Sequence, residues 1–156
     1  MNNSHSETLG PPDLQLAGLQ IWVHGRQFPD SDEPHDRDWL NITAHCGGSG
    51  ASVWVNGAIL GSWSFSSFVR ECRVLYASLE GIAVLRSDEP NLSVTLAAGR
   101  TGHLGMVVDI TPEIMTQRHR FDFGDLDQTF LPAVINQCES VLEVYPTAFT
   151  HPAADV

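Results

Sequence analysis

The 156-residue chain contains no lysine, and its eight cationic side chains are all arginines scattered along the sequence. Nineteen Asp and Glu residues give a formal net charge of −11 at pH 7. Nucleic-acid binding depends on clustered cationic side chains that release counter-ions from phosphates. The charge balance therefore argues against a nucleic-acid partner. Strong negative charge favours fast encounter with a basic partner, although acidity also serves simply to keep a protein soluble.

Long apolar runs are also missing. No segment approaches the roughly 18 residues that a transmembrane helix needs, so we expect no contact with a membrane. The first residues, MNNSHSETLGPPDL, have neither a basic start nor an apolar stretch and do not resemble a signal peptide. We therefore expect a cytoplasmic protein.

Cysteine is scarce, with three residues at Cys46, Cys72 and Cys138. Three cysteines cannot all pair within one chain, and none belongs to a CxxC motif. Reduced thiols, as in the cytoplasm, are the simplest interpretation. Cys72 and Cys138 fall on apolar helical stripes, where a free cysteine behaves as a small hydrophobic residue, and we expect both in the core.

Motifs of catalysis and of metal binding are not found. The sequence has no GxSxG, no SxxK and no phosphate loop. None of the seven histidines pairs at HxH or HxxxH spacing, which argues against a zinc site. In an EF-hand count from Asp30, His35 takes position six and Asn41 position twelve, where Gly and Glu are required. We therefore predict no catalytic residue, no metal site and no cofactor.

Alternating apolar and polar side chains predict a β-rich core, because a period of two marks a strand with one buried face. Such runs cover Leu19–Val23, Leu40–Ala44, Leu92–Ala97, Leu104–Ile110 and 119–123, with shorter strands expected at Val53–Val55, Ile59–Leu60 and Ile82–Leu85.

Glycines mark the expected turns. Leu14 and Leu16 precede the first run in the opposite register, so Gly18 should mark a bulge or a tight turn. Asn56-Gly57 lies between two short apolar runs and is a strong hairpin signal, because a type I′ turn needs positive φ at both central residues. Residues 47–50, Gly-Gly-Ser-Gly, are expected to form a flexible connection.

Two segments carry apolar side chains at i, i+3, i+4 and i+7, which is typical of amphipathic helices. The first predicts a helix over Phe65–Glu80 with Ser64 as its N-cap. The second predicts a helix at about Thr129–Tyr145, capped by Asp127 or Thr129. Together the elements predict an α+β fold with a mostly antiparallel sheet, partly rolled or sandwich-like, and two helices, one mid-chain and one C-terminal.

The domain organisation follows from where the patterning begins and ends. Residues 1–13 are polar and contain two prolines, and they are interpreted as a disordered leader. Residues 14–146 are expected to form a single globular domain, because no linker or repeat interrupts them. Residues 147–156 are expected to be a loose tail.

The densest charge cluster lies in residues 29–38, where five acids and one arginine give a local charge of −5 + 1 = −4. The acids are Asp30, Asp32, Glu33, Asp36 and Asp38. A solvated loop is one interpretation, and a loop that steers a basic partner is the other.

Trp22 and Trp54 lie in predicted strands, where an aromatic side chain packs in the core or, when exposed, provides an interface anchor. The acidic loop and these two tryptophans are our candidate partner-binding residues.

Several short motifs resemble the WapI-like immunity proteins, small bacterial cytoplasmic proteins associated with contact-delivered toxins. The likeness spans residues 14–146 and rests on Gly25-Arg26-Gln27-Phe28-Pro29, Asp36-Arg37-Asp38-Trp39-Leu40, Trp63-Ser64-Phe65 and Glu89-Pro90-Asn91-Leu92. The resemblance implies a non-enzymatic inhibitor that binds a toxin, and it implies no catalytic residue.

Two classes of function are therefore open. In the first, the protein is an immunity protein that covers a basic toxin domain. In the second, it is a small-molecule-binding or enzymatic domain whose polar residues converge only in the fold, and a deep pocket lined with histidines and carboxylates would favour it.

Overall fold

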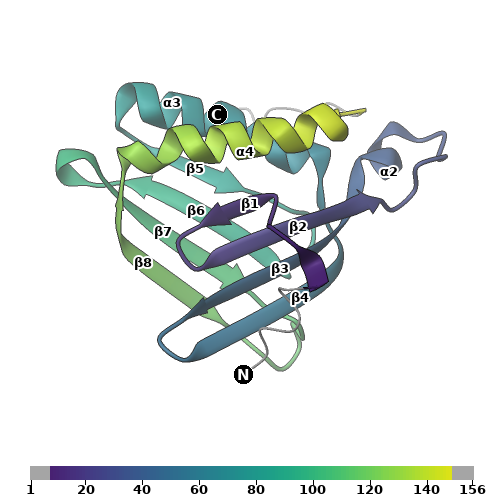
Figure 1. Ribbon diagram of the computed structural model, residues 1–156, viewed down its shortest axis with the longest axis horizontal. Helices are drawn as coiled ribbons and strands as arrows, with labels where there is room; N and C mark the ends of the chain where they lie inside the picture. The colour runs from purple at the N-terminus through teal and green to yellow at the C-terminus, as the bar shows by residue number, and fades with distance from the viewer. Residues whose placement is uncertain (1–7, 149–156) are drawn as a thin grey trace.

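The computed structural model describes residues 8–148, which form two antiparallel four-stranded sheets with helices along one side (Figure 1). The strand order is β1-β2-β3-β4 in the first sheet and β5-β6-β7-β8 in the second. The predicted α+β class with antiparallel sheets and two long helices is confirmed. Of the predicted leader and tail, residues 1–7 and 149–156 lie outside the described residues.

The first sheet contains β1 (Leu14–Leu16), β2 (Leu19–Arg26), β3 (Trp39–Gly48) and β4 (Ala51–Gly61). The expected turn at Gly18 is present, since Leu16 pairs with Leu19 across a two-residue connection. A Cβ atom on Gly18 would lie 2.1 Å from the backbone oxygen of Gly47 on β3. Glycine is required there because the turn and the neighbouring strand approach so closely.

The predicted hairpin turn at Asn56-Gly57 is wrong. Both residues lie inside the continuous strand β4, where they pair with Thr43 and Ile42 of β3. The hairpin turn is Ser49-Gly50, with φ values of 51° and 87°, and Gly48 pairs with Ala51 on either side of it. Two positive φ values are the signature of a type I′ turn. The hairpin therefore has the expected type of turn, but the turn lies at Ser49-Gly50 and not at Asn56-Gly57.

The second sheet contains β5 (Ile82–Leu85), β6 (Leu92–Ala98), β7 (His103–Ile110) and β8 (Arg120–Asp127), with a short 3-10 turn η1 (Arg100–Gly102) between β6 and β7. On β6 and β7 burial alternates strictly along the strand, as the sequence predicts. Their inward side chains are Leu92, Val94, Leu96, Leu104, Met106, Val108 and Ile110.

The predicted mid-chain helix is present as α3 (Ser62–Ser78), which starts three residues earlier than expected. Gly61 is the N-cap, and its N–H donates to Ser64 Oγ at 3.0 Å, so the serine closes the first turn from inside the helix. The helix ends at Leu79, which adopts the left-handed conformation with φ 57°.

The C-terminal helix is present as α4 (Leu131–Val144), preceded by the 3-10 turn η2 (Gln128–Phe130). Asp127 caps this turn, and it was one of the two predicted cap residues. Its carboxylate accepts a hydrogen bond from the Thr129 N–H at 2.8 Å. That bond and the one from the Thr129 hydroxyl lower the pKa of the Asp127 carboxyl. Pro132 lies in the first turn of α4, where a missing N–H has no cost.

Buried side chains from both sheets, α3 and α4 form one hydrophobic cluster. It includes Cys72 and Cys138, both fully buried as predicted. In Figure 1 the two helices run side by side along one edge of the sheets, with α3 on β5 and α4 near β1. Within residues 8–148 no helix has the length and apolar character to cross a membrane.

Candidate functional site

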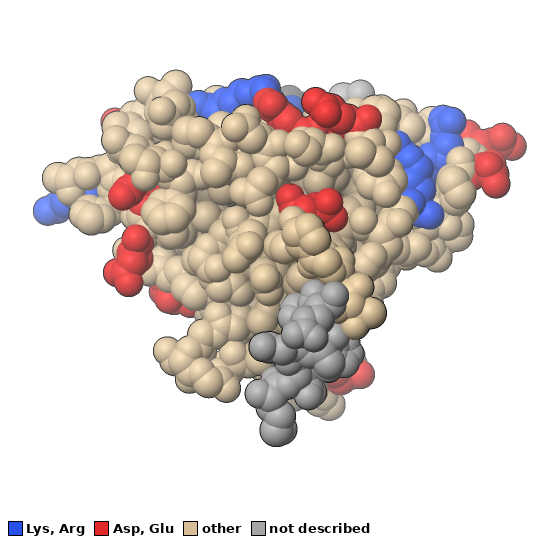
Figure 2. Space-filling view, in the orientation of Figure 1, with Lys and Arg blue, Asp and Glu red and all other residues tan. Residues whose placement is uncertain are grey.

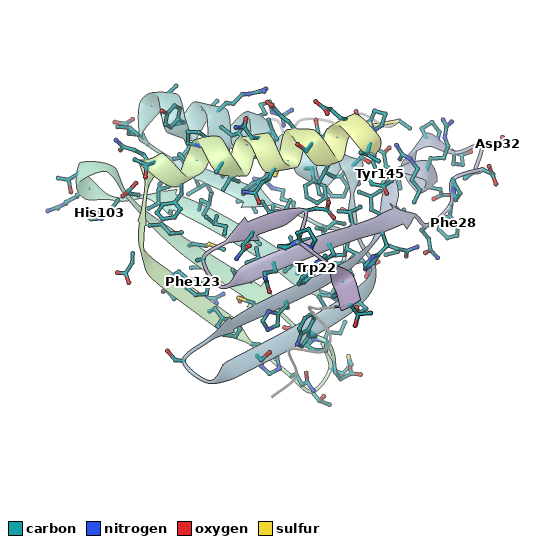
Figure 3. All side chains as sticks on the ribbon, viewed as in Figure 1. Trp22, Phe28, Asp32, His103, Phe123 and Tyr145 are labelled. Carbon is teal, nitrogen blue, oxygen red and sulfur yellow. The ribbon has the colours of Figure 1, made fainter. Side chains whose placement is uncertain are left out.

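The predicted acidic loop connects β2 to the short helix α2 (Pro34–Asp38) and protrudes at one end of the molecule, as the labelled Phe28 and Asp32 show in Figure 3. Asp30, Asp32 and Glu33 are exposed, and Asp36 is half-buried. Within the described part of the chain, none of these four carboxylates forms an ion pair. Figure 2 shows red acidic atoms at that end of the face, beside arginines, and a further acidic group near the middle of an otherwise mostly tan face.

Asp38, the fifth acid of the loop, is fully buried. Its carboxylate lies 3.6 Å from Arg26 Nη1 and accepts a hydrogen bond from the Ala148 N–H at 2.6 Å. The Arg26 guanidinium also donates to the Pro146 oxygen at 2.6 Å and lies over the Tyr145 ring. Asp38 therefore fixes the base of the loop to the chain after α4, and it is not accessible to a partner.

The two candidate tryptophans meet on the outer face of the first sheet. The Trp22 and Trp54 rings stack with centroids 5.8 Å apart and an angle of 17° between their planes. Trp22 is only 3% exposed and donates its indole N–H to the Gly10 oxygen at 2.9 Å. Trp54 is half-buried. Trp54 is therefore the less buried of the two tryptophans, and Trp22 packs against it.

Residues 10–13, which the sequence analysis placed in a disordered leader, hold this arrangement together. Besides the bond from Trp22 to Gly10, the Asp13 carboxylate accepts from the Val23 N–H at 2.7 Å, and the Asp13 N–H donates to the Ile21 oxygen at 2.8 Å. This segment explains why Trp22 is buried although its strand neighbours Ile21 and Val23 lie on the opposite face.

His45 completes the aromatic group, with its ring 4.3 Å from that of Trp54. Its Nε2 lies 2.7 Å from Ser52 Oγ and its Nδ1 lies 3.2 Å from Gln20 Oε1. Burial lowers the pKa of His45 below its usual 6.5, because the charged imidazolium loses hydration there. The ring is therefore neutral near pH 7 and adds to the uncharged character of the face.

A second hydrogen-bonded chain lies beside this group. His24 Nε2 lies 2.8 Å from Thr43 Oγ1, and the Thr43 hydroxyl donates to Asn56 Oδ1 at 2.7 Å. The sequence patterning did not bring His24 and His45 near Trp54. Strand register brings them together, since Thr43 pairs with both Trp22 and Asn56 while His45 pairs with Trp54. The sequence analysis missed this register because it placed the hairpin turn at Asn56-Gly57.

Two observations bear on the enzymatic alternative. Among residues 8–148 there is no group of three or more His, Cys, Asp or Glu side chains placed to hold a metal ion. A groove of about 390 Å³ lies along β4, and Glu89 is the one ionisable side chain in its lining. The residues of the outer face form an aromatic and polar surface.

Comparison with known proteins gives one family match. Residues 13–146 match the model of the "Immunity protein WapI-like family". No curated protein and no solved structure matches the chain. The match covers nearly all of the described residues, including both sheets, the acidic loop and the aromatic face. The chain therefore belongs to the WapI-like immunity protein family.

Proposed function

We propose that the protein is a non-enzymatic immunity protein that binds and inhibits a bacterial toxin domain delivered by cell contact. Membership of the immunity family supports this function. The observation that carries it is the pairing of an exposed, uncompensated acidic loop with an uncharged aromatic face. Asp30, Asp32 and Glu33 protrude without ion pairs within residues 8–148, and Trp54 lies half-buried beside Trp22 on the same sheet.

The partner we propose is a basic toxin domain, such as a nuclease, whose phosphate-binding surface is positively charged. The net charge of −11 attracts such a surface over a distance, and the acidic loop concentrates that attraction at one end. Trp54, backed by Trp22 and His45, has the composition of an interface core, where aromatic side chains are enriched and charged ones depleted.

The enzymatic or small-molecule alternative has less support. The groove along β4 contains one carboxylate and no histidine, whereas acid–base chemistry uses paired, mutually perturbed groups. We further propose that the protein acts in the cytoplasm. Its three cysteines are buried free thiols, which suits a reducing compartment.

The test is co-expression. The toxin domain encoded beside this gene is expressed in a susceptible host with the protein, and survival is compared with that of cells carrying an empty vector. We expect rescue, together with a stable complex of the two purified proteins. A control is the chain with Phe68→Ala, which weakens the core and should reduce rescue without altering the proposed surface. Failure of the wild-type protein both to rescue and to bind would overturn the proposed function.

A further inference from the structure

Strand β4 forms one edge of the first sheet, and within residues 8–148 no other strand pairs with its outer side, which borders the groove. Natural proteins usually protect such an edge with charged side chains or proline, because free backbone groups attract strands from other molecules. The stretch Trp54–Ile59 reads Trp-Val-Asn-Gly-Ala-Ile and contains neither. The edge is therefore open to strand addition.

The turn geometry shows which backbone groups point outward. Across a two-residue turn, the flanking residues Gly48 and Ala51 form a hydrogen-bonded pair, and in an antiparallel ladder bonded and non-bonded pairs then alternate. Counting along the register, Val55 and Gly57 bond to β3, whereas Asn56 and Ala58 direct their N–H and C=O groups away from it.

The open edge ends at a defined point. Ile59 is the extra residue of a bulge, since Leu40 pairs with Leu60 while the next residue, Asn41, pairs with Ala58. The Ser87 hydroxyl donates to the Ile59 oxygen and so occupies the edge at that position. Within residues 8–148, no backbone hydrogen bond reaches the outer side of Asn56 or Ala58. An added strand therefore has room beside these residues and stops before Ile59.

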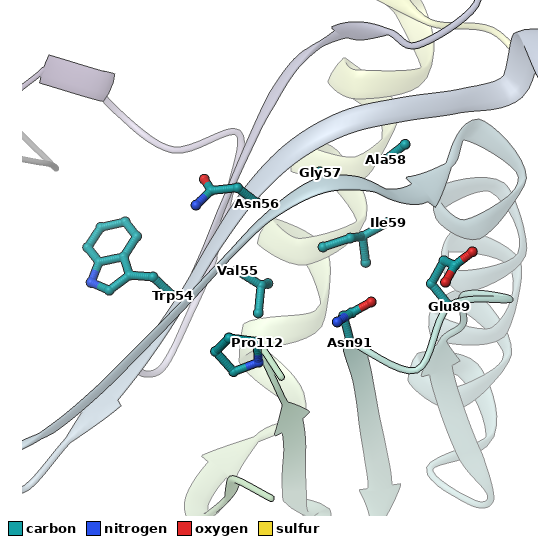
Figure 4. A pocket seen from close by; sticks show the side chains of 9 residues that line it. All are labelled: Trp54, Val55, Asn56, Gly57, Ala58, Ile59, Glu89, Asn91 and Pro112. Atoms are coloured by element: carbon teal, nitrogen blue, oxygen red, sulfur yellow. The ribbon is translucent and has the colours of Figure 1, made fainter. Parts of the chain in front are cut away.

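The groove beside this edge is lined by β4 together with Glu89, Asn91 and Pro112. Figure 4 shows Val55 and Ile59 turned towards Asn91 and Pro112, whereas Trp54 and Asn56 project to the other side of the strand. Asn91 uses its side-chain N–H to bond the Thr111 oxygen at 2.9 Å, which leaves its amide oxygen as an acceptor in the groove. The Glu89 carboxylate forms no ion pair with any described residue. A mainly polar groove with two acceptors suits an extended segment with a basic side chain.

We propose that β4 receives an extended segment of the toxin, which adds a strand to the first sheet at Asn56 and Ala58 and places an arginine or lysine against Glu89. This inference rests on the proposed function and names how the partner is recognised. Strand addition takes affinity from the backbone and specificity from alternate side chains, which here meet Trp54 on one side and the groove on the other. A second copy of this chain is disfavoured as the occupant, because each copy carries a net charge of −11.

Amide hydrogen exchange followed by NMR tests the proposal on the full chain, alone and bound to the toxin domain. We expect the Asn56 and Ala58 amides to exchange rapidly in the free protein and to slow by about tenfold or more in the complex. The Val55 and Gly57 amides, which bond to β3, serve as internal controls and should be protected in both states. A complex in which Asn56 and Ala58 remain unprotected would overturn strand addition and leave the immunity function standing.

Two variants extend the test. Ala58→Pro removes the outward N–H and leaves the bonds to β3 intact, because proline is tolerated on an edge strand where its nitrogen faces solvent. We expect about tenfold weaker binding, whereas Ala58→Ser, the matched variant that keeps the N–H, should lose much less affinity. Glu89→Gln should weaken binding and reduce its salt dependence. Equal affinity of Ala58→Pro and Ala58→Ser would contradict the proposal.

The same samples also distinguish two other outcomes, a dimer of this chain and the absence of any complex. Protection of Asn56 and Ala58 in the free protein, together with a dimer in sedimentation, would assign the edge to a second copy and overturn the proposal. The absence of any complex would overturn both strand addition and the proposed function. The exchange measurement needs no substitution, so it decides the question even if Ala58→Pro does not fold.

Discussion

The Arg26 guanidinium lies 3.6 Å from the fully buried carboxylate of Asp38, and the two residues join three distant parts of the chain. Arg26 ends β2 and donates to the oxygens of Arg37 and Pro146. Asp38 ends α2 and accepts from the Ala148 N–H. This pair therefore holds the base of the acidic loop in place while Asp30, Asp32 and Glu33 stay exposed.

Replacing Asp38 by Asn should destabilise the protein by about 1.5–3 kcal/mol, the usual contribution of a buried hydrogen bond to a charged group. The amide keeps the shape of the side chain but removes the charge that faces Arg26. Asp36→Asn is the matched control, because Asp36 belongs to the same helix and forms no ion pair among the described residues; it should change stability by less than about 0.5 kcal/mol. Urea unfolding measures both, and equal stability of the two variants would contradict this role for Asp38.

Phe68 on α3 is 1% exposed and lies in the hydrophobic cluster between the helices and the sheets. Phe68→Ala should reduce the free energy of unfolding by about 3–5 kcal/mol, through lost burial and the cavity left behind. Val74, on the same helix, is 61% exposed, so Val74→Ala should cost less than about 0.5 kcal/mol. Denaturant melts check this, and a loss below about 1 kcal/mol for Phe68→Ala would show that the site repacks.

Much of the fold could be predicted because its signals are local. Strict alternation identified β6 and β7, and helical spacing identified α3 and α4. The hairpin error came from two segments with suitable turn chemistry close together, Ser49-Gly50 and Asn56-Gly57. Local sequence does not decide between the two segments. A turn at Ser49-Gly50 lets β3 and β4 form ten residue pairs, from Gly48 with Ala51 to Trp39 with Gly61.

The candidate site was only partly predictable, because burial depends on contacts between distant residues. Asp38 resembles its acidic neighbours in sequence, but Arg26 and the Ala148 N–H surround it in the fold. Trp22 looks as exposed as Trp54 by strand alternation, but the segment at Gly10 covers it. His45 lies beside Trp54 because the two residues pair between β3 and β4. That register follows from the turn at Ser49-Gly50, which the sequence analysis did not identify as the hairpin turn.

Stability should fall as the pH drops below about 6.5, in part because of His45. Burial lowers the pKa of this histidine in the folded protein from 6.5, so the unfolded chain binds a proton more readily than the folded one. The contribution of His45 is present above pH 6.5 and is lost as the pH falls through 6.5 towards the lower pKa of the folded state. Unfolding free energies from pH 8 to pH 5 should therefore decline less steeply for His45→Gln, and identical slopes for the two proteins would contradict the prediction.

Removal of metal ions should not change stability. The sequence lacks metal-ligand spacing, and the described residues contain no suitable cluster of His, Cys, Asp and Glu. A metal ion bound only to the native state would raise the melting temperature by mass action. We therefore expect the same melting temperature with and without a chelator, and no stoichiometric zinc or calcium in elemental analysis. A sharp drop in melting temperature with chelator would show a site that these residues do not explain.

Neutralising the acidic loop should slow association with the toxin domain more than it speeds dissociation. Charges at the rim of an interface steer diffusional encounter, whereas buried aromatic contacts determine how long the complex lasts. The variant D30N/D32N/E33Q/D36N removes the four accessible carboxylates and keeps Asp38, so the base of the loop stays anchored.

The measurement is stopped-flow or surface-plasmon binding to the toxin domain at two salt concentrations. The quadruple variant should associate more slowly at low salt, by about tenfold, and its association rate should depend less on salt. Trp54→Ala is the complementary variant, because it leaves the charge unchanged and should accelerate dissociation while association remains near the wild-type rate. If the quadruple variant associates as fast as wild type at low salt, the loop is a solvated surface and the steering role fails. If Trp54→Ala dissociates as slowly as wild type, the aromatic face lies outside the interface, and the acidic loop alone would then have to account for recognition.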